Sequence, residues 1–232
     1  MLSQSALPNE TKALFAKAIC LVPPADDQFA TVMGLASMVA TSFRYQKDEE
    51  IFGEDEPAEY VYQVIQGAVR TYKLLSDGRR QIGSFHLKGD VFGLEYGAKH
   101  RATAEALCAT EVRLIQRRAL ENVAKIDVQV SRILWNVTSG ELRHAEDHML
   151  LLGCKTAMER VAAFLLEMDS RLKAASMVAL PMCRRDIGDY LGLTLETVSR
   201  ALSQLHEQGV LDFSGARQIV IKNRQRLRDI SE

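Results

Sequence analysis

The amino-acid sequence predicts an α+β protein with a jelly-roll-like antiparallel β-roll, a long dimerisation helix and a C-terminal winged helix-turn-helix. Three observations support this fold. Short apolar runs, many of them alternating, fill residues 44–116 as expected for a series of β-strands. Residues 127–152 contain no proline and are enough for an unusually long helix, and residues 183–211 have the pattern of two helices joined by a tight turn. The expected domains are the β-roll with its preceding helices over 1–117, a helical segment over 118–153 and the winged helix-turn-helix over 154–232.

Composition excludes several classes of protein. The chain has 232 residues, of which 47% are hydrophobic, as is ordinary for a globular protein. No apolar run approaches the roughly 20 residues that span a bilayer, and no signal-peptide pattern is present, so we expect a cytoplasmic protein without a membrane partner. The net charge is −1, with a mild basic excess after residue 154, which favours contact with phosphates at a few defined points. The cysteines are widely spaced, which indicates reduced thiols.

The first part of the chain is expected to form helices and then strands. Two helices are predicted over residues 11–19 and 27–38, separated by a Pro-Pro pair. Within the strand region, Gly78 and Gly89 mark two turns, because glycine supplies the positive φ that such turns need.

The predicted long helix carries two apolar stripes. One follows the alternating steps of three and four residues that are typical of a coiled-coil seam, and the other, Val130, Leu134 and Val137, would face the β-roll. We favour a dimer interface along the seam over a helix buried on its own protomer, because pairing allows a helix-turn-helix protein to recognise a palindrome. The seam consists of Trp135, Thr138, Leu142, Ala145, Met149 and Leu152.

The helix-turn-helix segment has an inner and an outer side. Ile187 and Leu191 would point inward from the first helix, which would end at Gly192, and the hydroxyl of Thr194 would cap the second helix. At about 100° per residue, the second helix has two chemically distinct faces. The inner face holds Val198, Ala201, Leu202 and Leu205, and the outer face holds Leu195, Glu196, Ser199 and Arg200. The outer groups suit base edges in a major groove, and a hairpin signal follows, so we favour DNA binding over a merely solvated helical hairpin.

Cys183 occupies the position where Ser, Thr, Asp or Asn normally caps a helix. The helix N-terminus and the guanidiniums of Arg184 and Arg185 favour a thiolate, and thiolate character governs susceptibility to oxidation. The same groups would meet a DNA phosphate. We hypothesise that oxidation of Cys183 to a sulfenic or sulfinic acid weakens DNA binding. The alternative is a small capping residue with no regulatory role.

Four motifs indicate a known family. They are QGAVRTYK and LKGDVFG in the expected β-roll, TAMERVAAFLLEM after the long helix, and LETVSRALSQLHEQGVL in the helix-turn-helix. With these motifs the chain resembles the CRP/FNR superfamily of bacterial transcription regulators over almost its whole length. The most specific part is the ETVSR core, Glu196 to Arg200, which looks like an FNR-type recognition helix. Within the superfamily the chain is most similar to the FixK-type regulators of low-oxygen and nitrogen-fixation genes.

The resemblance implies a homodimer that binds double-stranded DNA at a palindrome of TTGA-type half-sites and activates transcription. Arg200 would donate to guanine and Glu196 would accept from the opposite cytosine, with Leu195 and Ser199 near neighbouring bases. Those roles also match the chemistry of the base edges. The side chains expected at phosphates are Arg184, Arg185, Thr194 and Thr197. The segments expected to contact RNA polymerase are 76–80 and 171–179.

Departures from the family pattern argue against a bound cofactor. Relatives that bind cyclic AMP have a Gly-Glu segment, followed at a longer interval by Arg-Ser. Here Leu94 stands in place of the Glu and Ala102 in place of the Ser, so two partners of a nucleotide are missing. An iron-sulfur cluster normally requires four thiolates, and Cys20 is the only cysteine in the first 100 residues. We expect DNA binding without a cofactor; the alternative is a regulator gated by a small-molecule effector in the β-roll.

No motif predicts an enzyme. The sequence lacks a Gly-rich phosphate loop, a nucleophile elbow and a paired metal-ligand motif, so we expect no catalytic residue and no metal. The nearest candidate is the pair His144 and His148, which could bind a metal across a dimer. Glu146 stands at the wrong position for the H-E-x-x-H pattern, and a solvated helix face is the preferred interpretation.

Overall fold

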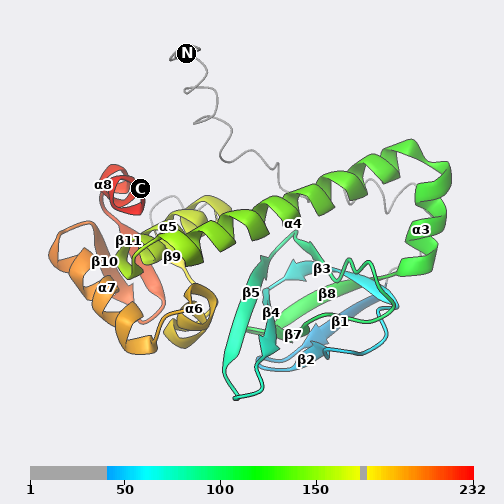
Figure 1. The fold of residues 1–232 in the computed structure, drawn as a ribbon, viewed down its shortest axis with the longest axis horizontal. Helices are drawn as coiled ribbons and strands as arrows, with labels where there is room; N and C mark the ends of the chain where they lie inside the picture. Colours follow the sequence, from blue (N-terminus) through cyan, green and yellow to red (C-terminus); the bar gives the residue numbers. More distant parts are fainter. Residues whose placement is uncertain (1–40, 173–176) are drawn as a thin grey trace, which may run out of the picture.

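The structure is a computed structural model that describes residues 41–172 and 177–232. The helices predicted over residues 11–19 and 27–38 lie outside the described residues. Figure 1 shows an N-terminal β-roll, a long helix that crosses above it and a smaller C-terminal domain beyond its far end. Among the described residues, no helix is both long enough and apolar enough to cross a membrane.

The β-roll consists of two four-stranded antiparallel sheets, with strand orders β1-β8-β3-β6 and β2-β7-β4-β5. Side chains from both sheets fill a shared core, in which Val64, Val69 and Val112 are fully buried. The β-roll predicted from the alternating apolar runs is therefore confirmed. Its strands are β1 (Thr41–Tyr45), β2 (Glu50–Phe52), β3 (Tyr60–Gln66), β4 (Ala68–Leu74), β5 (Arg80–Leu87), β6 (Val91–Phe92), β7 (Thr103–Ala106) and β8 (Thr110–Gln116).

Glycines with positive φ make the tight turns of the β-roll. Gly78 and Gly89 have φ angles of 84° and 94°, as the predicted turns require. Gly67, between β3 and β4, has a φ of 89° and lies against the backbone of β8. A Cβ atom at this position would lie 2.7 Å from the carbonyl oxygen of Ala109, so a larger residue is both strained and crowded.

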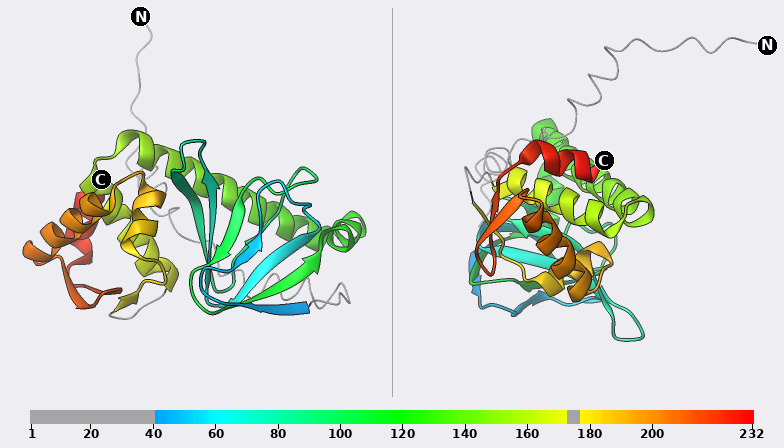
Figure 2. Two further views of the ribbon diagram at one scale, coloured as in Figure 1. Left: turned by 90° about the horizontal axis from the view of Figure 1, so that it is seen from below. Right: turned by 90° about the vertical axis from the view of Figure 1, so that its left-hand side faces the viewer.

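Two helices follow the β-roll: α3 (Arg117–Ile126) and α4 (Val128–Cys154). Asp127 begins α4 by accepting a 2.8 Å hydrogen bond from the backbone N–H of Gln129. Val130, Leu134 and Val137 belong to one apolar cluster with side chains of β3, β6 and β8. The inner stripe therefore packs on the β-roll as predicted. Figures 1 and 2 show α4 continuing past the β-roll to the C-terminal domain.

The second stripe of α4 has little cover from the residues that the structure describes. Trp135, Leu142 and Met149 expose 73%, 61% and 64% of their surfaces. Thr138 and Ala145 are also exposed, and Leu152 is half-buried. Exposure of this stripe among residues 41–172 and 177–232 favours a dimer interface over a helix buried on its own protomer.

The C-terminal domain begins with a capping box at Thr156 and Glu159: the Glu159 carboxylate accepts from the Thr156 backbone N–H at 2.8 Å. The strands form one antiparallel sheet of order β10-β11-β9, in which β10 and β11 are the predicted hairpin. The two-residue strand β9 and the final helix α8 add to the expected fold. The elements are α5 (Ala157–Leu172), β9 (Val178–Ala179), α6 (Arg184–Leu191), α7 (Leu195–Glu207), β10 (Leu211–Gly215), β11 (Gln218–Ile221) and α8 (Arg224–Ser231).

Two glycine substitutions should separate backbone strain from crowding. Gly78→Ala places a Cβ atom in open space, so we expect a loss of about 1 kcal/mol from the positive φ alone. Gly67→Ala adds the clash with the backbone of β8, and we expect a loss of about 3 kcal/mol or more. Urea unfolding of the two variants measures the difference. Equal losses would show that β8 moves aside without cost.

Candidate nucleic-acid interface

The turn between α6 and α7 fixes the two helices against each other. Gly192 ends α6 with φ 63° and ψ 37°, and the hydroxyl of Thr194 caps α7 by accepting from the backbone N–H of Thr197 at 3.2 Å. Both predictions are confirmed. Gly188 is a further requirement that the sequence pattern did not indicate. A Cβ atom there would lie 2.7 Å from the carbonyl oxygen of Leu193, so the close turn requires glycine in the middle of α6.

Helix α7 separates an inner face from an outer one, as its periodicity predicts. The inner side chains Val198, Ala201, Leu202 and Leu205 are buried in the domain core. On the outer face, Leu195 exposes 39% of its surface, Glu196 and Arg200 are exposed, and Ser199 is half-buried. Thr194 is exposed beside them and Thr197 is half-buried. The fold therefore presents one apolar, one acidic, one hydroxyl and one basic group from a single helix.

The carboxyl group of Glu196 is prepared to accept hydrogen bonds. Its pKa is lowered by its own backbone N–H, by the hydroxyl of Thr194 and, more weakly, by the charges of Arg200 and Arg185. Glu196 is consequently ionised at neutral pH. An ionised carboxylate is an acceptor only, which is the chemistry that an exocyclic amino group requires of its partner.

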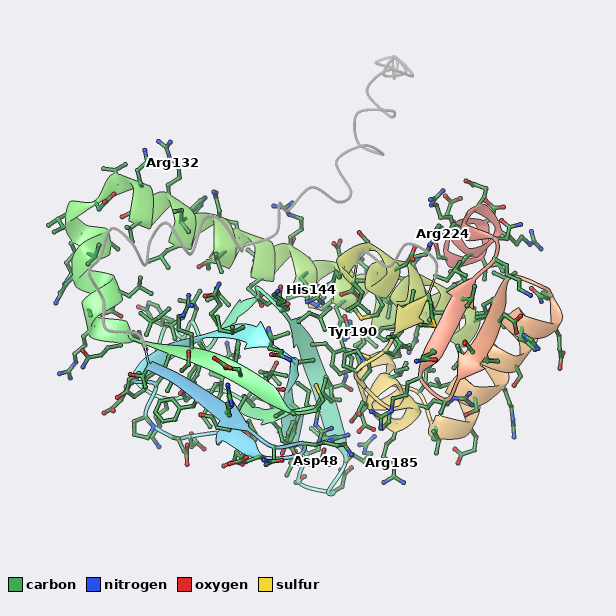
Figure 3. All side chains as sticks on the ribbon, turned by 180° about the vertical axis from the view of Figure 1, so that it is seen from behind. Asp48, Arg132, His144, Arg185, Tyr190 and Arg224 are labelled. Atoms are coloured by element: carbon green, nitrogen blue, oxygen red, sulfur yellow. The ribbon has the colours of Figure 1, made fainter. Side chains whose placement is uncertain are left out.

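Two neighbouring arginines at the start of α6 differ in their surroundings. Arg185 is exposed, and Figure 3 shows its side chain pointing away from the domain at the lower edge of the junction with the β-roll. Arg184 is half-buried; its guanidinium lies 5.6 Å from the ring centre of Phe213 and its Nη1 lies 3.4 Å from Ser199 Oγ. Arg184 thus contacts both the β10–β11 hairpin, which forms the wing, and helix α7. The sequence pattern gave no sign of this contact.

Cys183 begins α6 and is half-buried. Its thiol lies 3.0 Å from Asp186 Oδ2, which also accepts from the Cys183 backbone N–H at 3.0 Å. The capping pattern at Cys183 indicated the neighbouring cations but not this carboxylate. The thiol lines a cleft of about 350 Å³ between the β-roll and α6, together with Arg185 and Arg217.

A second hollow, of about 200 Å³, lies in the β-roll beneath α4. Its wall includes Leu94 and Ala102, the two departures from the nucleotide-binding pattern. The acidic groups of its wall are Glu95 and Glu141, and within residues 41–172 and 177–232 no Lys or Arg lines it. The imidazole of His86 is buried there, and desolvation lowers its pKa to about 3, with smaller contributions from Arg171 and His144. This wall is unsuited to a phosphate.

The histidine pair of α4 packs against α6. The ring centres of His148 and Tyr190 lie 4.2 Å apart, and His144 Nε2 lies 3.4 Å from the Tyr190 hydroxyl. Figure 3 shows His144 above Tyr190 at the junction of α4 and α6. The part of the chain that the structure describes contains no cluster of three or more His, Cys, Asp or Glu side chains that could hold a metal. The pair serves helix packing.

Comparison with known proteins gives consistent results over most of the chain. Residues 42–127 match the cyclic nucleotide-binding domain family, and residues 159–230 match the Crp-like helix-turn-helix domain family. The nitrogen fixation regulation protein FixK of Azorhizobium caulinodans is 41% identical, over 88% of this chain and 84% of that protein. FixK of Rhizobium meliloti is 40% identical, over 83% of this chain and 87% of that protein. The solved structure of FixK2 from Bradyrhizobium japonicum is 75% identical, with a TM-score of 0.82, and covers 84% of this chain and 98% of that one.

The burial of His86 should appear in the pH dependence of stability. In the unfolded chain a histidine has a pKa of about 6.5. Below that pH, His86 is protonated in the unfolded state but stays neutral in the folded state. We expect the free energy of unfolding to fall as pH falls from 6.5, by up to about 1.4 kcal/mol per pH unit from this group. His86→Gln should flatten this dependence, measured by urea unfolding between pH 5 and 7. The exposed control His206→Gln should leave it unchanged, and parallel curves for wild type and His86→Gln would contradict the assignment.

Proposed function

This chain belongs to the CRP/FNR family of transcription regulators, within its FixK group, and from that premise we propose that it binds a TTGA-type palindrome as a homodimer without a bound cofactor. The observation that carries the proposal is the two-sided helix α7. One of its faces is fixed in the domain core, and the other presents base-contacting chemistry to solvent. The family consists of regulators, not enzymes.

The outer face of α7 supports a specific set of base contacts. Arg200 would donate to O6 and N7 of a guanine, and the ionised Glu196 would accept from N4 of a cytosine. Leu195 would place an apolar tip near a thymine methyl group. Ser199 would contact a neighbouring base, with its hydroxyl positioned by Arg184.

Phosphate contacts would come from the ends of α6 and α7. Arg185 is exposed beside the α6 N-terminus, where backbone N–H groups also favour an anion. Thr194 caps the N-terminus of α7, and Thr197 lies in its first turn, among the residues proposed to contact bases. We retain Arg184 as a phosphate contact, although its bond to Ser199 limits how far it can reach.

The exposed stripe of α4 supports pairing with a second copy of the chain. A contiguous apolar stripe on a soluble regulator normally marks an interaction surface. An isologous pair would bring the stripe of each protomer against the same stripe of its partner, Trp135, Leu142 and Met149 included. Two recognition helices related by a two-fold axis would then match the two halves of a palindrome.

The hollow in the β-roll supports the cofactor-free proposal over the ligand-gated alternative. Its volume of about 200 Å³ is below the roughly 300–1,000 Å³ typical of ligand pockets. Its carboxylates, Glu95 and Glu141, would repel a cyclic nucleotide. If the protein is instead gated by a ligand, this wall suits a small uncharged effector.

RNA polymerase is the second proposed partner. The β4–β5 hairpin carries the exposed Leu74 and Leu75 and an exposed tip over residues 76–79. Arg80 and Arg171, which belong to the segments assigned to polymerase by resemblance, instead form ion pairs within the chain. The hairpin tip is therefore the better candidate. Both partners place the protein in the cytoplasm.

We also propose redox control through Cys183, with a peroxide as oxidant. The sulfur would attack one peroxide oxygen, forming an S–O bond as the O–O bond breaks, and the leaving hydroxide would take up the thiol proton as water. A second equivalent would give the sulfinic acid. The added charge would stand at the start of α6 beside Arg185, where a DNA phosphate is expected, and would repel it.

The assigned roles of two arginines can be tested against each other. We expect Arg200→Ala to lose about 1–3 kcal/mol on a TTGA palindrome and little on scrambled DNA, because its contact depends on the base. Arg185→Ala should weaken binding to both sequences alike and reduce the salt slope by about 1. Fluorescence titrations at several salt concentrations measure both effects. Unchanged sequence discrimination in Arg200→Ala would refute its assignment.

Peroxide treatment tests the role of Cys183. Oxidised wild type should bind the palindrome more weakly than reduced wild type, because oxidation adds a negative charge opposite phosphate. Cys183→Ser should keep its affinity under peroxide, and the control Cys154→Ser, which removes an exposed thiol, should still lose affinity. Affinity is measured after the peroxide has been removed. An equal loss of DNA affinity in wild type and Cys183→Ser would contradict the redox proposal.

A further inference from the structure

A network of ion pairs joins the β-roll to the first helix of the helix-turn-helix. At its centre is Asp186 of α6, which exposes only 3% of its surface. Asp186 Oδ1 accepts from Arg70 Nη1 of β4 at 3.0 Å and from Arg80 Nη2 of β5 at 2.7 Å. Arg80 also donates from Nε to Asp189 at 2.8 Å. Two strands of the β-roll thus bind two carboxylates of one helix.

Other contacts extend this junction along β5. The side-chain amide of Gln81 donates to the backbone carbonyl of Tyr190 at 3.2 Å. In the opposite direction, Arg171 of α5 donates to the carbonyl of Phe85 at 2.8 Å and pairs with Asp90. The view in Figure 3 places Asp48 and Arg185 at the lower edge of this junction and His144 with Tyr190 at its upper edge.

The ion pairs of Asp186 form only when α6 lies against β4 and β5, so they favour one arrangement of the helix-turn-helix domain and the β-roll. Burial acts to raise the pKa of Asp186, but hydrogen bonds from Cys183 and the charges of Arg70 and Arg80 outweigh it, so the pKa is lowered. The carboxylate therefore stays ionised at neutral pH, and its contribution is lost only as pH falls below its ordinary value. A buried carboxylate is stable only while such partners are present. Arg70 also pairs with Glu105 and Asp48 of its own domain, whereas the two carboxylates that pair with Arg80, Asp186 and Asp189, both lie on α6.

We propose that Arg80, through Asp186 and Asp189, is a positioning residue that holds the helix-turn-helix in its DNA-binding orientation without an effector. This inference rests on the proposed DNA binding. Helix α6 carries α7 through the tight turn at Gly188 and Gly192, so fixing α6 also fixes the outer face of α7. Loss of the Arg80 contact would lower the population of the competent orientation, and the apparent affinity would fall with that population.

The test compares four substitutions, each made in the whole chain. Arg80→Gln removes the charge, Arg80→Lys keeps it, and Arg79→Gln removes the charge of the exposed neighbour, which pairs with Asp77. The side chain of Arg80 is 20% exposed, so these variants should fold. Asp189→Asn removes one of its two carboxylate partners and should act in the same direction, but less strongly.

Two readouts are needed for each variant: affinity for a TTGA palindrome and for scrambled DNA, and hydrogen exchange of the α6 and β5 amides. We expect Arg80→Gln to bind both DNAs about three- to tenfold more weakly and to exchange faster in α6 and β5, with saturating palindrome restoring slow exchange. Arg80→Lys should keep most of the affinity and Arg79→Gln all of it. A merely structural loss would accelerate exchange throughout the chain, including β3 and β8.

Three outcomes would overturn the inference. Wild-type affinity and exchange in Arg80→Gln would show that the contact positions nothing, and lost affinity with unchanged exchange would indicate a direct DNA contact. Global acceleration of exchange would indicate a role in folding alone. Failure of the proposed function is distinct, because the wild-type protein itself would then show no preference for the palindrome.

Discussion

The carboxylate of Asp186 is the contact on which the arrangement of this molecule depends. Within α6 it accepts from the backbone and thiol of Cys183, and across the domain boundary it accepts from Arg70 and Arg80. One buried acid therefore both closes the first turn of the helix-turn-helix and attaches it to the β-roll. Any charge that forms on the sulfur of Cys183 would stand beside this acid, so the same small region would experience both DNA contact and domain docking.

The long helix α4 and the tight turn before α7 extend this fixed geometry in two directions. The inner stripe of α4 packs on the β-roll while Trp135 and Leu142 remain exposed, so one helix carries both the contact with the β-roll and the exposed stripe. On the other side, Gly188 allows α6 and α7 to approach closely, and α7 presents Arg200 to solvent. The hollow beneath α4 is small and acidic, which is consistent with a domain that supports the fold more than it binds an anion.

Periodicity and turn chemistry made much of the fold predictable from the sequence. The buried face of α7, the left-handed Gly192 and the wing all follow from patterns within a few residues. Contacts distant in sequence were not predictable: Arg80 lies more than 100 residues from Asp186, and no local pattern pairs them. Arg184 was expected at a phosphate, yet its bond to Ser199 depends on how two helices cross. The short strand β9 and helix α8 bury too few side chains to leave a clear periodic signal.

We propose that the protein is in its DNA-binding form without an effector. The most direct measurement is titration of the purified, reduced, ligand-free wild-type protein onto a TTGA palindrome at several salt concentrations, with and without a cyclic nucleotide. We expect sequence-specific binding that falls steeply with salt and does not respond to the nucleotide. Binding that appears only when the nucleotide is added would contradict it.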